Sequence, residues 1–228
     1  MSDHADTLGA RRGRSAKAPL TSRSIVEAAL GLIEERGADA VALRHVAERV
    51  ETGAASLYAY FTGRDALLEH VLDAAYAQVE LVEADGRERG WREALADTIA
   101  NTITTLERYA GLGSVALGTI PVLPGALRLA EHELSLMEHG GVPGERAALG
   151  VDLIAQFAAS SAIERTVRAS GDRGAGERQQ VLSAYENADP ERFPRVRRQA
   201  ALLTGPDERT RRDFAIRALI AGIERTAP

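Results

Sequence analysis

Residues 43–64 read LRHVAERVETGAASLYAYFTGR and contain two short helical patterns separated by about four turn-forming residues. In the first pattern apolar residues recur with helical spacing, at Leu43, Val46, Ala47 and Val50. In the second, Leu57 and Phe61 lie four residues apart and can pack on that apolar face. The other side of the second helix carries Ser56, Tyr58, Ala59 and Tyr60. Two tyrosines outside so short a helix indicate a contact surface, as in a helix-turn-helix motif whose second helix enters the DNA major groove.

The composition favours a folded, reduced protein. Hydrophobic residues make up 45% of the 228, which is enough for a core. There is no cysteine, so disulfides, thiolate metal sites and cysteine nucleophiles are excluded. The sequence shows no signal peptide, and no stretch approaches 18 uncharged apolar residues, so we expect a cytoplasmic protein without a membrane partner.

Charge is divided unevenly along the chain. Residues 9–64 carry nine Lys/Arg against six Asp/Glu, a net charge of +3. Residues 65–228 carry 19 Lys/Arg against 25 Asp/Glu, a net charge of −6. The overall charge of −5 therefore does not exclude DNA binding, because attraction would be local to the N-terminal module.

Residues 1–20 show no hydrophobic period and contain a loose basic cluster. Its members are Arg11, Arg12, Arg14 and Lys17. The segment is either a solvated tail or an arm that lies along phosphates or in the minor groove when DNA is bound.

A compact unit surrounds the helix-turn-helix. Thr21 or Ser22 predicts the N-cap of a first helix that runs to about Arg36 and ends at Gly37. After the motif, residues 63–65 open a long helix that we expect to continue to about Glu83.

The rest of the chain has no strand pattern and no repeat, so we predict an all-α protein. A long helix is expected to join the three-helix N-terminal domain (21–68) to a C-terminal helical bundle (69–228). Segment 110–125 should be broken, with a turn at 123–125, and 170–176 should be a loop. Helices are expected at 91–109, 126–139, 143–169, 177–187, 191–203 and 206–225.

Two of these helices, 146–167 and 210–223, are apolar nearly all round in their middles. A helix without a polar face is buried on all sides. The helices therefore either pack against a symmetry mate in a two-fold dimer or lie inside one subunit.

Residues 21–75 resemble the TetR family of bacterial transcriptional repressors. The first helix matches the family pattern at Ile25, Ala28, Ala29, Leu30, Leu32, Ile33 and Gly37. The second and third helices match at Arg44, Val46, Ala47, Val50, Ser56, Leu57, Tyr58, Tyr60 and Phe61, and the fourth at Arg64, Leu67 and Leu68. The resemblance implies a homodimer that binds a pseudo-palindromic operator in double-stranded DNA and leaves it when a small-molecule effector fills a C-terminal pocket.

The resemblance also implies DNA contacts. Arg44 would read a base, or contact phosphate or lie on the plain surface instead, and Thr21 and Arg64 would clamp the DNA backbone. Recognition-helix contacts would come from Ser56, Tyr58 and Tyr60, with Ala54, Ala55 and Ala59 against thymine methyl groups or permitting close approach. With so few polar readers, we expect DNA shape and the arm to supply part of the specificity.

Two residues depart from the family pattern in the turn. Glu51 stands where the family has a glycine, at a position that favours positive φ. Gly53 stands where the family has a Ser or Thr N-cap, so the start of the recognition helix is uncertain by about two residues.

Polar residues interrupt two apolar helices of the C-terminal domain. They are Thr98, Asn101, Thr102 and Thr105 in the first, and Gln156, Ser160 and Ser161 in the second. If buried, such groups need partners, which a ligand pocket, interhelix hydrogen bonds or solvent would supply.

No cofactor or metal is expected. His132 and His139 lie seven residues apart with glutamates near them, but no HExxH motif is present. The run 171–176 (GDRGAG) is interpreted as a loop, because no strand precedes it and no Gly-Lys-Ser/Thr follows.

Two other functions remain open. One is a helical interaction module that has lost DNA binding, supported by Glu51 and the alanine-rich recognition helix. The other is a small helical enzyme that uses the C-terminal cavity, although no nucleophile–base or paired-carboxylate spacing stands out. Salt-sensitive operator binding would separate the regulator from both.

Overall fold

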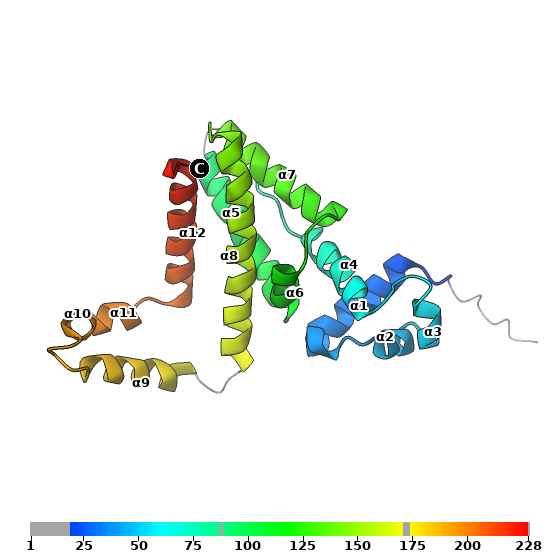
Figure 1. Ribbon diagram of the computed structural model, residues 1–228, viewed down its shortest axis with the longest axis horizontal. Coiled ribbons are helices and arrows are strands. Elements are labelled where there is room, and N and C mark those ends of the chain that lie inside the picture. Colours follow the sequence, from blue (N-terminus) through cyan, green and yellow to red (C-terminus); the bar gives the residue numbers. More distant parts are fainter. Residues whose placement is uncertain (1–18, 87–88, 171–173, 228) are drawn as a thin grey trace, which may run out of the picture.

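The computed structural model describes residues 19–86, 89–170 and 174–227, and every regular element within these ranges is helical, which confirms the all-α prediction. A helix-turn-helix unit lies at one end of the longest axis, and a small group of helices lies at the other (Figure 1). The N-terminal elements are α1 (Ser22–Arg36), the 3-10 turn η1 (Ala38–Ala40), α2 (Leu43–Arg49), α3 (Ala54–Leu57) and α4 (Arg64–Tyr76). The others are α5 (Trp91–Arg108), α6 (Leu112–Gly118), α7 (Pro124–His139), α8 (Gly144–Ser170), α9 (Gly174–Glu186), α10 (Pro194–Arg198), α11 (Ala200–Thr204) and α12 (Glu208–Arg225).

Helix α1 begins and ends where its local sequence predicts. The Thr21 hydroxyl accepts a hydrogen bond from the Ser24 backbone N–H, and the Ser24 hydroxyl accepts one from the Thr21 backbone N–H. This capping box satisfies two otherwise unpaired donors. Gly37 follows the helix with φ of +78°, a conformation that glycine adopts without steric cost.

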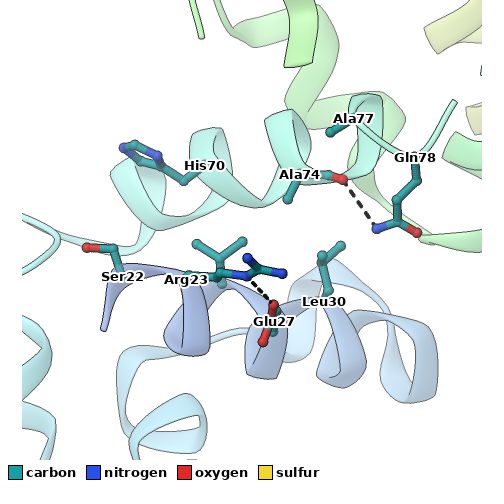
Figure 2. Close-up of a pocket in the computed structure, with 9 residues that line it drawn as sticks. Ser22, Arg23, Glu27, Leu30, His70, Ala74, Ala77 and Gln78 are labelled. Carbon is teal, nitrogen blue, oxygen red and sulfur yellow. Dashed lines mark hydrogen bonds and ion pairs between the residues drawn. The ribbon is translucent and has the colours of Figure 1, made fainter. Parts of the chain in front are cut away.

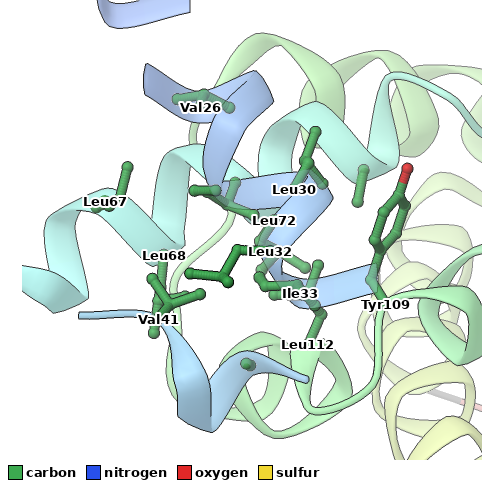
Figure 3. Close-up of a cluster of buried hydrophobic side chains, with 14 of the residues drawn as sticks. Val26, Leu30, Leu32, Ile33, Val41, Leu67, Leu68, Leu72, Tyr109 and Leu112 are labelled. Carbon is green, nitrogen blue, oxygen red and sulfur yellow. The ribbon is translucent and has the colours of Figure 1, made fainter. Parts of the chain in front are cut away.

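The helix-turn-helix unit shares its apolar core with the C-terminal domain. Figure 3 shows Val41 and Leu67 of the unit in one cluster with Tyr109 and Leu112, which lie on either side of the α5–α6 turn. A backbone hydrogen bond of 2.8 Å from the Ala38 N–H to the Ala110 carbonyl joins η1 to the same turn. The α5–α6 turn is therefore packed into the base of the helix-turn-helix unit.

Gly111 in this turn has no room for a side chain. Its φ is +93°, and an added Cβ would lie 2.8 Å from the Cβ of Ala38. We expect Gly111→Ala to lower the free energy of unfolding by about 2 kcal/mol, through positive-φ strain and the displaced contact. Denaturant titration would measure it. Gly118→Ala is the control, because a Cβ there meets nothing within 4 Å; equal stabilities for the two variants would contradict the prediction.

Helix α4 ends earlier than predicted. It stops at Tyr76 rather than near Glu83, and the following residues run without regular structure past α5 and α7. Side chains of those helices bind the freed backbone groups: Thr98 accepts from the Val82 N–H at 3.2 Å, and the Asn101 amide donates to the Glu80 carbonyl at 2.9 Å. These side-chain bonds pair backbone groups that a longer helix would otherwise pair, so ending α4 at Tyr76 does not leave those groups without partners.

Three other boundaries differ from the prediction. No turn is made at 123–125, because Pro124 takes the first position of α7, where its missing N–H costs no hydrogen bond. Helix α9 starts at Gly174, so the predicted loop at 170–176 is shorter. The single helix predicted at 191–203 is divided into α10 and α11 at Gln199, whose backbone is not helical (φ −105°, ψ 11°). Helix α10 has no buried residue, so no core contact stabilises a longer helix there.

Helices α8 and α12 are not enclosed within one subunit. Leu149, Leu153 and Phe214 are 59%, 46% and 69% exposed, so the one-subunit alternative is wrong. By length and composition alone, Gly144–Arg168 could also cross a membrane, with a mean hydropathy of 1.2. Its exposed side, however, also carries Asp152 and Gln156, which suits a protein interface better than lipid.

Candidate nucleic-acid interface and regulatory core

The second helix of the motif has one buried and one exposed side, as predicted. Leu57 and Phe61 are buried and pack into the shared core. Tyr58 and Tyr60 point outward and are 60% and 40% exposed. This division leaves an aromatic, hydroxyl-bearing surface on the outside of the unit.

The turn before α3 accommodates Glu51 and Gly53, the two residues that depart from the family pattern. Glu51 adopts φ of +54°, as expected at a position where glycine is usual. Gly53 is the N-cap of α3 and makes no side-chain capping bond. Helix α3 is correspondingly short, spanning Ala54–Leu57, and tight turns continue it to Tyr60.

Arg44 is held at the exposed end of α2 by its neighbour. The His45 Nδ1 lies 2.9 Å from the Ala40 carbonyl, which requires Nδ1 to carry the proton. The unprotonated Nε2 then accepts from Arg44 Nε at 3.1 Å. This arrangement orients the guanidinium and leaves its two terminal nitrogens for a ligand.

Tyr60 and Thr21 both make hydrogen bonds at the start of α1. The Tyr60 hydroxyl donates to the Leu20 carbonyl at 2.8 Å, which connects the recognition segment (residues 54–60) to the chain just before α1. Thr21 is exposed and its hydroxyl serves the capping box. The first-turn amides of α1 thus lie close to the recognition segment, where they favour an anion.

Arg64 is engaged within the protein. Its Nε donates to the Val41 carbonyl at 2.7 Å and its Nη2 to the Ala38 carbonyl at 2.9 Å. The guanidinium therefore holds the loop that carries η1, and only Nη1, 3.9 Å from Asp65, is left for the predicted phosphate contact.

The remaining predicted DNA contacts differ in placement. Ala55 and Ser56 are exposed beside Tyr58, while Ala54 is partly buried against the core. The basic cluster Arg11, Arg12, Arg14 and Lys17 lies outside the described residues.

A groove of about 410 Å³ runs between α1 and α4 on the same unit. Figure 2 shows its polar rim, where Arg23 donates to Glu27 at 2.8 Å, opposite His70 on α4. Its floor is apolar, formed by Val26, Leu30 and Ala74. None of the predicted DNA contacts within the described residues lines this groove.

The residues predicted for a ligand pocket differ in burial. Thr98 and Thr102 are buried, whereas Gln156 and Ser160 lie on the exposed side of α8. Asn101 bonds the Glu80 carbonyl, and Thr105 donates to the Asn101 carbonyl at 2.8 Å. Most of these polar groups thus have hydrogen-bond partners within their own helix or in the irregular segment after α4.

Two neighbouring residues of α7 are buried that the sequence did not assign to a pocket. Glu133 is 3% exposed, and burial raises its pKa from 4.5 to about 8. His132 lies beside Thr98, with its Nε2 3.1 Å from the Val82 carbonyl, while His139 is exposed. Glu133 has the spacing of the inner face of α7, with Leu129 and Leu136, which is the signal that could have identified it.

The described residues contain no group of three His, Asp or Glu side chains placed to hold a metal ion. His132 and His139 do not share a site, because only the first is turned inward.

Comparison with known proteins covers nearly the whole described chain. Residues 25–71 match the model of bacterial regulatory proteins of the tetR family. Residues 84–227 match the tetracyclin repressor-like C-terminal domain.

Two of the curated relatives are named as repressors. The HTH-type transcriptional repressor DrrR1 of Streptomyces coeruleorubidus is 28% identical over 168 residues, which are 74% of this chain and 62% of DrrR1. The chain thus spans less than two thirds of that relative. The class A tetracycline repressor protein of Escherichia coli is 26% identical over 159 residues, 70% of this chain and 72% of the repressor.

Solved structures extend the similarity to about nine tenths of this chain. Apo ActR of Streptomyces coelicolor matches with a TM-score of 0.82 and 29% identity, over 91% of this chain and 96% of ActR. ActR in complex with actinorhodin matches with a TM-score of 0.81 and 30% identity, over 90% of this chain and 97% of ActR.

Proposed function

The chain belongs to the TetR family of bacterial regulatory proteins, and from this premise we propose that it is a cytoplasmic, dimeric transcriptional repressor that a small molecule releases from a pseudo-palindromic operator. The observation that carries the proposal is a helix-turn-helix that presents both an oriented Arg44 guanidinium and an exposed Tyr58. An oriented fork of donors suits the O6 and N7 acceptors of guanine, and an exposed phenol suits a phosphate oxygen.

The DNA surface in this proposal combines a small reading element with several positioning groups. Arg44 reads a base, Tyr58 and Ser56 contact phosphate or base edges, and the α1 amides next to Thr21 bind phosphate. Arg64 acts through the protein by fixing the η1 loop, with Nη1 toward phosphate. Ala54 and Ala55 permit close approach, and the basic residues 11–17 add phosphate contacts along the arm.

The dimer in this proposal forms through α8 and α12. Their exposed apolar residues, among them Leu149, Leu153 and Phe214, would be covered by the same residues of a second copy. Two recognition helices then face half-sites about one helical turn apart, roughly 34–36 Å, or a multiple of that distance.

The release step in this proposal follows from the shared core. The α5–α6 turn packs against η1, so a ligand that shifts α5 or α6 moves the base of the helix-turn-helix unit. Ligand-bound ActR, in complex with actinorhodin or with (S)-DNPA, supports a small organic effector for this chain.

Selection of genomic fragments by the purified protein at two salt concentrations tests the proposal. A recovered palindrome whose binding weakens steeply with salt is the expected result. Absence of enrichment at low salt would contradict DNA binding and favour an interaction module, while turnover of a bound compound would favour an enzyme.

Substitutions of Arg44 and Tyr58 should affect operator binding in different ways. Arg44→Ala is expected to cost about 1–3 kcal/mol on the preferred sequence and to relax the preference at one base pair. Tyr58→Phe should weaken all sequences by a similar factor, since a phosphate contact carries no sequence information. Titration of the operator and of single-base variants measures both. An unchanged preference in Arg44→Ala would remove Arg44 as the base reader.

A further inference from the structure

His45, the third residue of α2, uses both nitrogens of its ring. Nδ1 lies 2.9 Å from the Ala40 carbonyl, which can only accept a hydrogen bond, so Nδ1 carries a proton. Nε2 lies 3.1 Å from Nε of Arg44, which can only donate, so Nε2 is unprotonated. The ring is half-buried, whereas Arg44 is exposed. One tautomer of His45 therefore connects η1 to the residue that we propose reads a base.

The bond from His45 restricts the guanidinium of Arg44. Nε and the two terminal nitrogens of an arginine lie in one plane, so a partner on Nε limits the directions in which the terminal nitrogens point. Without that partner, an exposed arginine loses more rotamer freedom when it binds the O6 and N7 acceptors of guanine. His45 thus pre-organises the reading group before DNA is bound.

Protonation of the His45 ring would change one of its two contacts and preserve the other. Both ring nitrogens of an imidazolium are donors, so Nδ1 would still donate to the Ala40 carbonyl. Nε2, however, would become a donor facing the Nε–H of Arg44, with a positive charge on each side. The contact that holds Arg44 is therefore lost while the contact with η1 remains.

The charged groups on the elements packed against α2 have other partners or are exposed. They are Glu35 of α1, 2.6 Å from Arg49, together with Asp39 of η1, 4.0 Å from Arg64 of α4, and Glu48 on α2 itself. Helix α3 carries no charged residue. Carboxylates and guanidinium groups in such exposed places keep their charge between pH 6 and 8, whereas imidazole is the side chain whose charge changes there.

We propose that His45 is the positioning residue for base recognition by Arg44, and that protonation of His45 relaxes the sequence preference of the protein. The inference rests on the proposed function, because it requires Arg44 to read a base. Protonation also adds a positive charge near the DNA, which favours every sequence alike. The preference between sequences, and not the overall affinity, is therefore the quantity that responds to the proton.

Asparagine at position 45 separates the two contacts of the ring. Its amide nitrogen takes the place of Nδ1 and can donate to the Ala40 carbonyl, but it has no atom in the place of Nε2. We expect His45→Asn to reduce the preference for the operator over a variant changed at the base pair read by Arg44 by about 5-fold. A His45 that only stabilised η1 would be replaced by asparagine without this loss.

The ratio of the affinities for the operator and for that single-base variant is measured at pH 8 and at pH 6. In the parent the ratio should fall by about 3-fold or more at pH 6. In His45→Asn it should be low at both values. His70→Asn is the control, because His70 is an exposed histidine of α4 in the same unit, and it should behave as the parent does. Phosphate contacts are common to both sequences, so their pH dependence cancels in the ratio.

A double-mutant cycle identifies the residue through which His45 acts. In an Arg44→Ala background, His45→Asn should no longer change the ratio, because the group that it positions is absent. Any one of three results would overturn the inference: a parental ratio in His45→Asn, a parental ratio that is the same at both pH values, or additive effects of the two substitutions.

Failure of the inference is distinguishable from failure of the proposed function. A protein that reads its operator through Arg44 without any dependence on His45 loses only the inference. An unchanged preference in Arg44→Ala removes the base reader from the proposed function, and the inference with it. A protein that binds no operator at low salt loses the proposed function as a whole.

Discussion

A glutamate in place of Leu153 is expected to convert the proposed dimer to a monomer and to weaken operator binding by about 100-fold or more. Leu153 lies on the exposed apolar face of α8, 46% exposed in the single subunit. In a two-fold interface each substitution appears twice, so two carboxylates would be buried without cations. The half-site contacts themselves are unchanged, and the loss comes from the second half-site no longer being held nearby.

Light scattering gives the mass and operator titration gives the affinity. Ile120→Glu is the matched control, because Ile120 is also an exposed apolar residue, 82% exposed, but lies between α6 and α7, away from α12. A Leu153→Glu protein that stays dimeric would place the interface elsewhere. A monomer that keeps full operator affinity would remove the dimer from the mechanism.

Replacing Glu133 by glutamine is expected to remove the pH dependence of stability that this residue imposes. The pKa of Glu133 is raised from 4.5 to about 8, so the folded protein keeps a proton that the unfolded chain releases at lower pH. The free energy of unfolding therefore falls as pH rises from about 4.5 to about 8, by as much as about 1.4 kcal/mol for each pH unit. Glutamine does not titrate, so the variant should exceed the parent by about 2–5 kcal/mol at pH 8 and show little gain at pH 5.

Denaturant unfolding at pH 5 and pH 8 checks this prediction without any ligand. Glu138→Gln on the exposed side of α7 should show the same difference from the parent at both values. A Glu133→Gln difference that does not change with pH would mean that the carboxyl is hydrated in the folded state.

The sequence was sufficient where one helical period and local capping decide the structure. Thr21 and Gly37 bound α1 as predicted, and Leu57 and Phe61 are buried on the face that their spacing indicated. Positive φ at Glu51 also followed from its place in the motif.

The sequence was insufficient where distant side chains compete with the backbone. The end of α4 depends on Thr98 and Asn101, which lie more than 15 residues away and bind the extended segment. The sequence shows the polar residues of α5, but spacing within one helix does not show which distant groups they bind. Glu133 was missed although its spacing places it on the inner face of α7, because spacing alone does not show that a carboxyl is buried.

The contact between the α5–α6 turn and η1 sets a rule for building chimeric regulators from this chain. A DNA-binding head exchanged at the end of α4 would leave Tyr109 and Leu112 without the apolar partners that they contact in the parent. It would also leave the Ala110 carbonyl facing a foreign turn in place of Ala38. A functional graft has to transfer or match this turn together with the head, so the unit that can be exchanged between such proteins is discontinuous in the sequence.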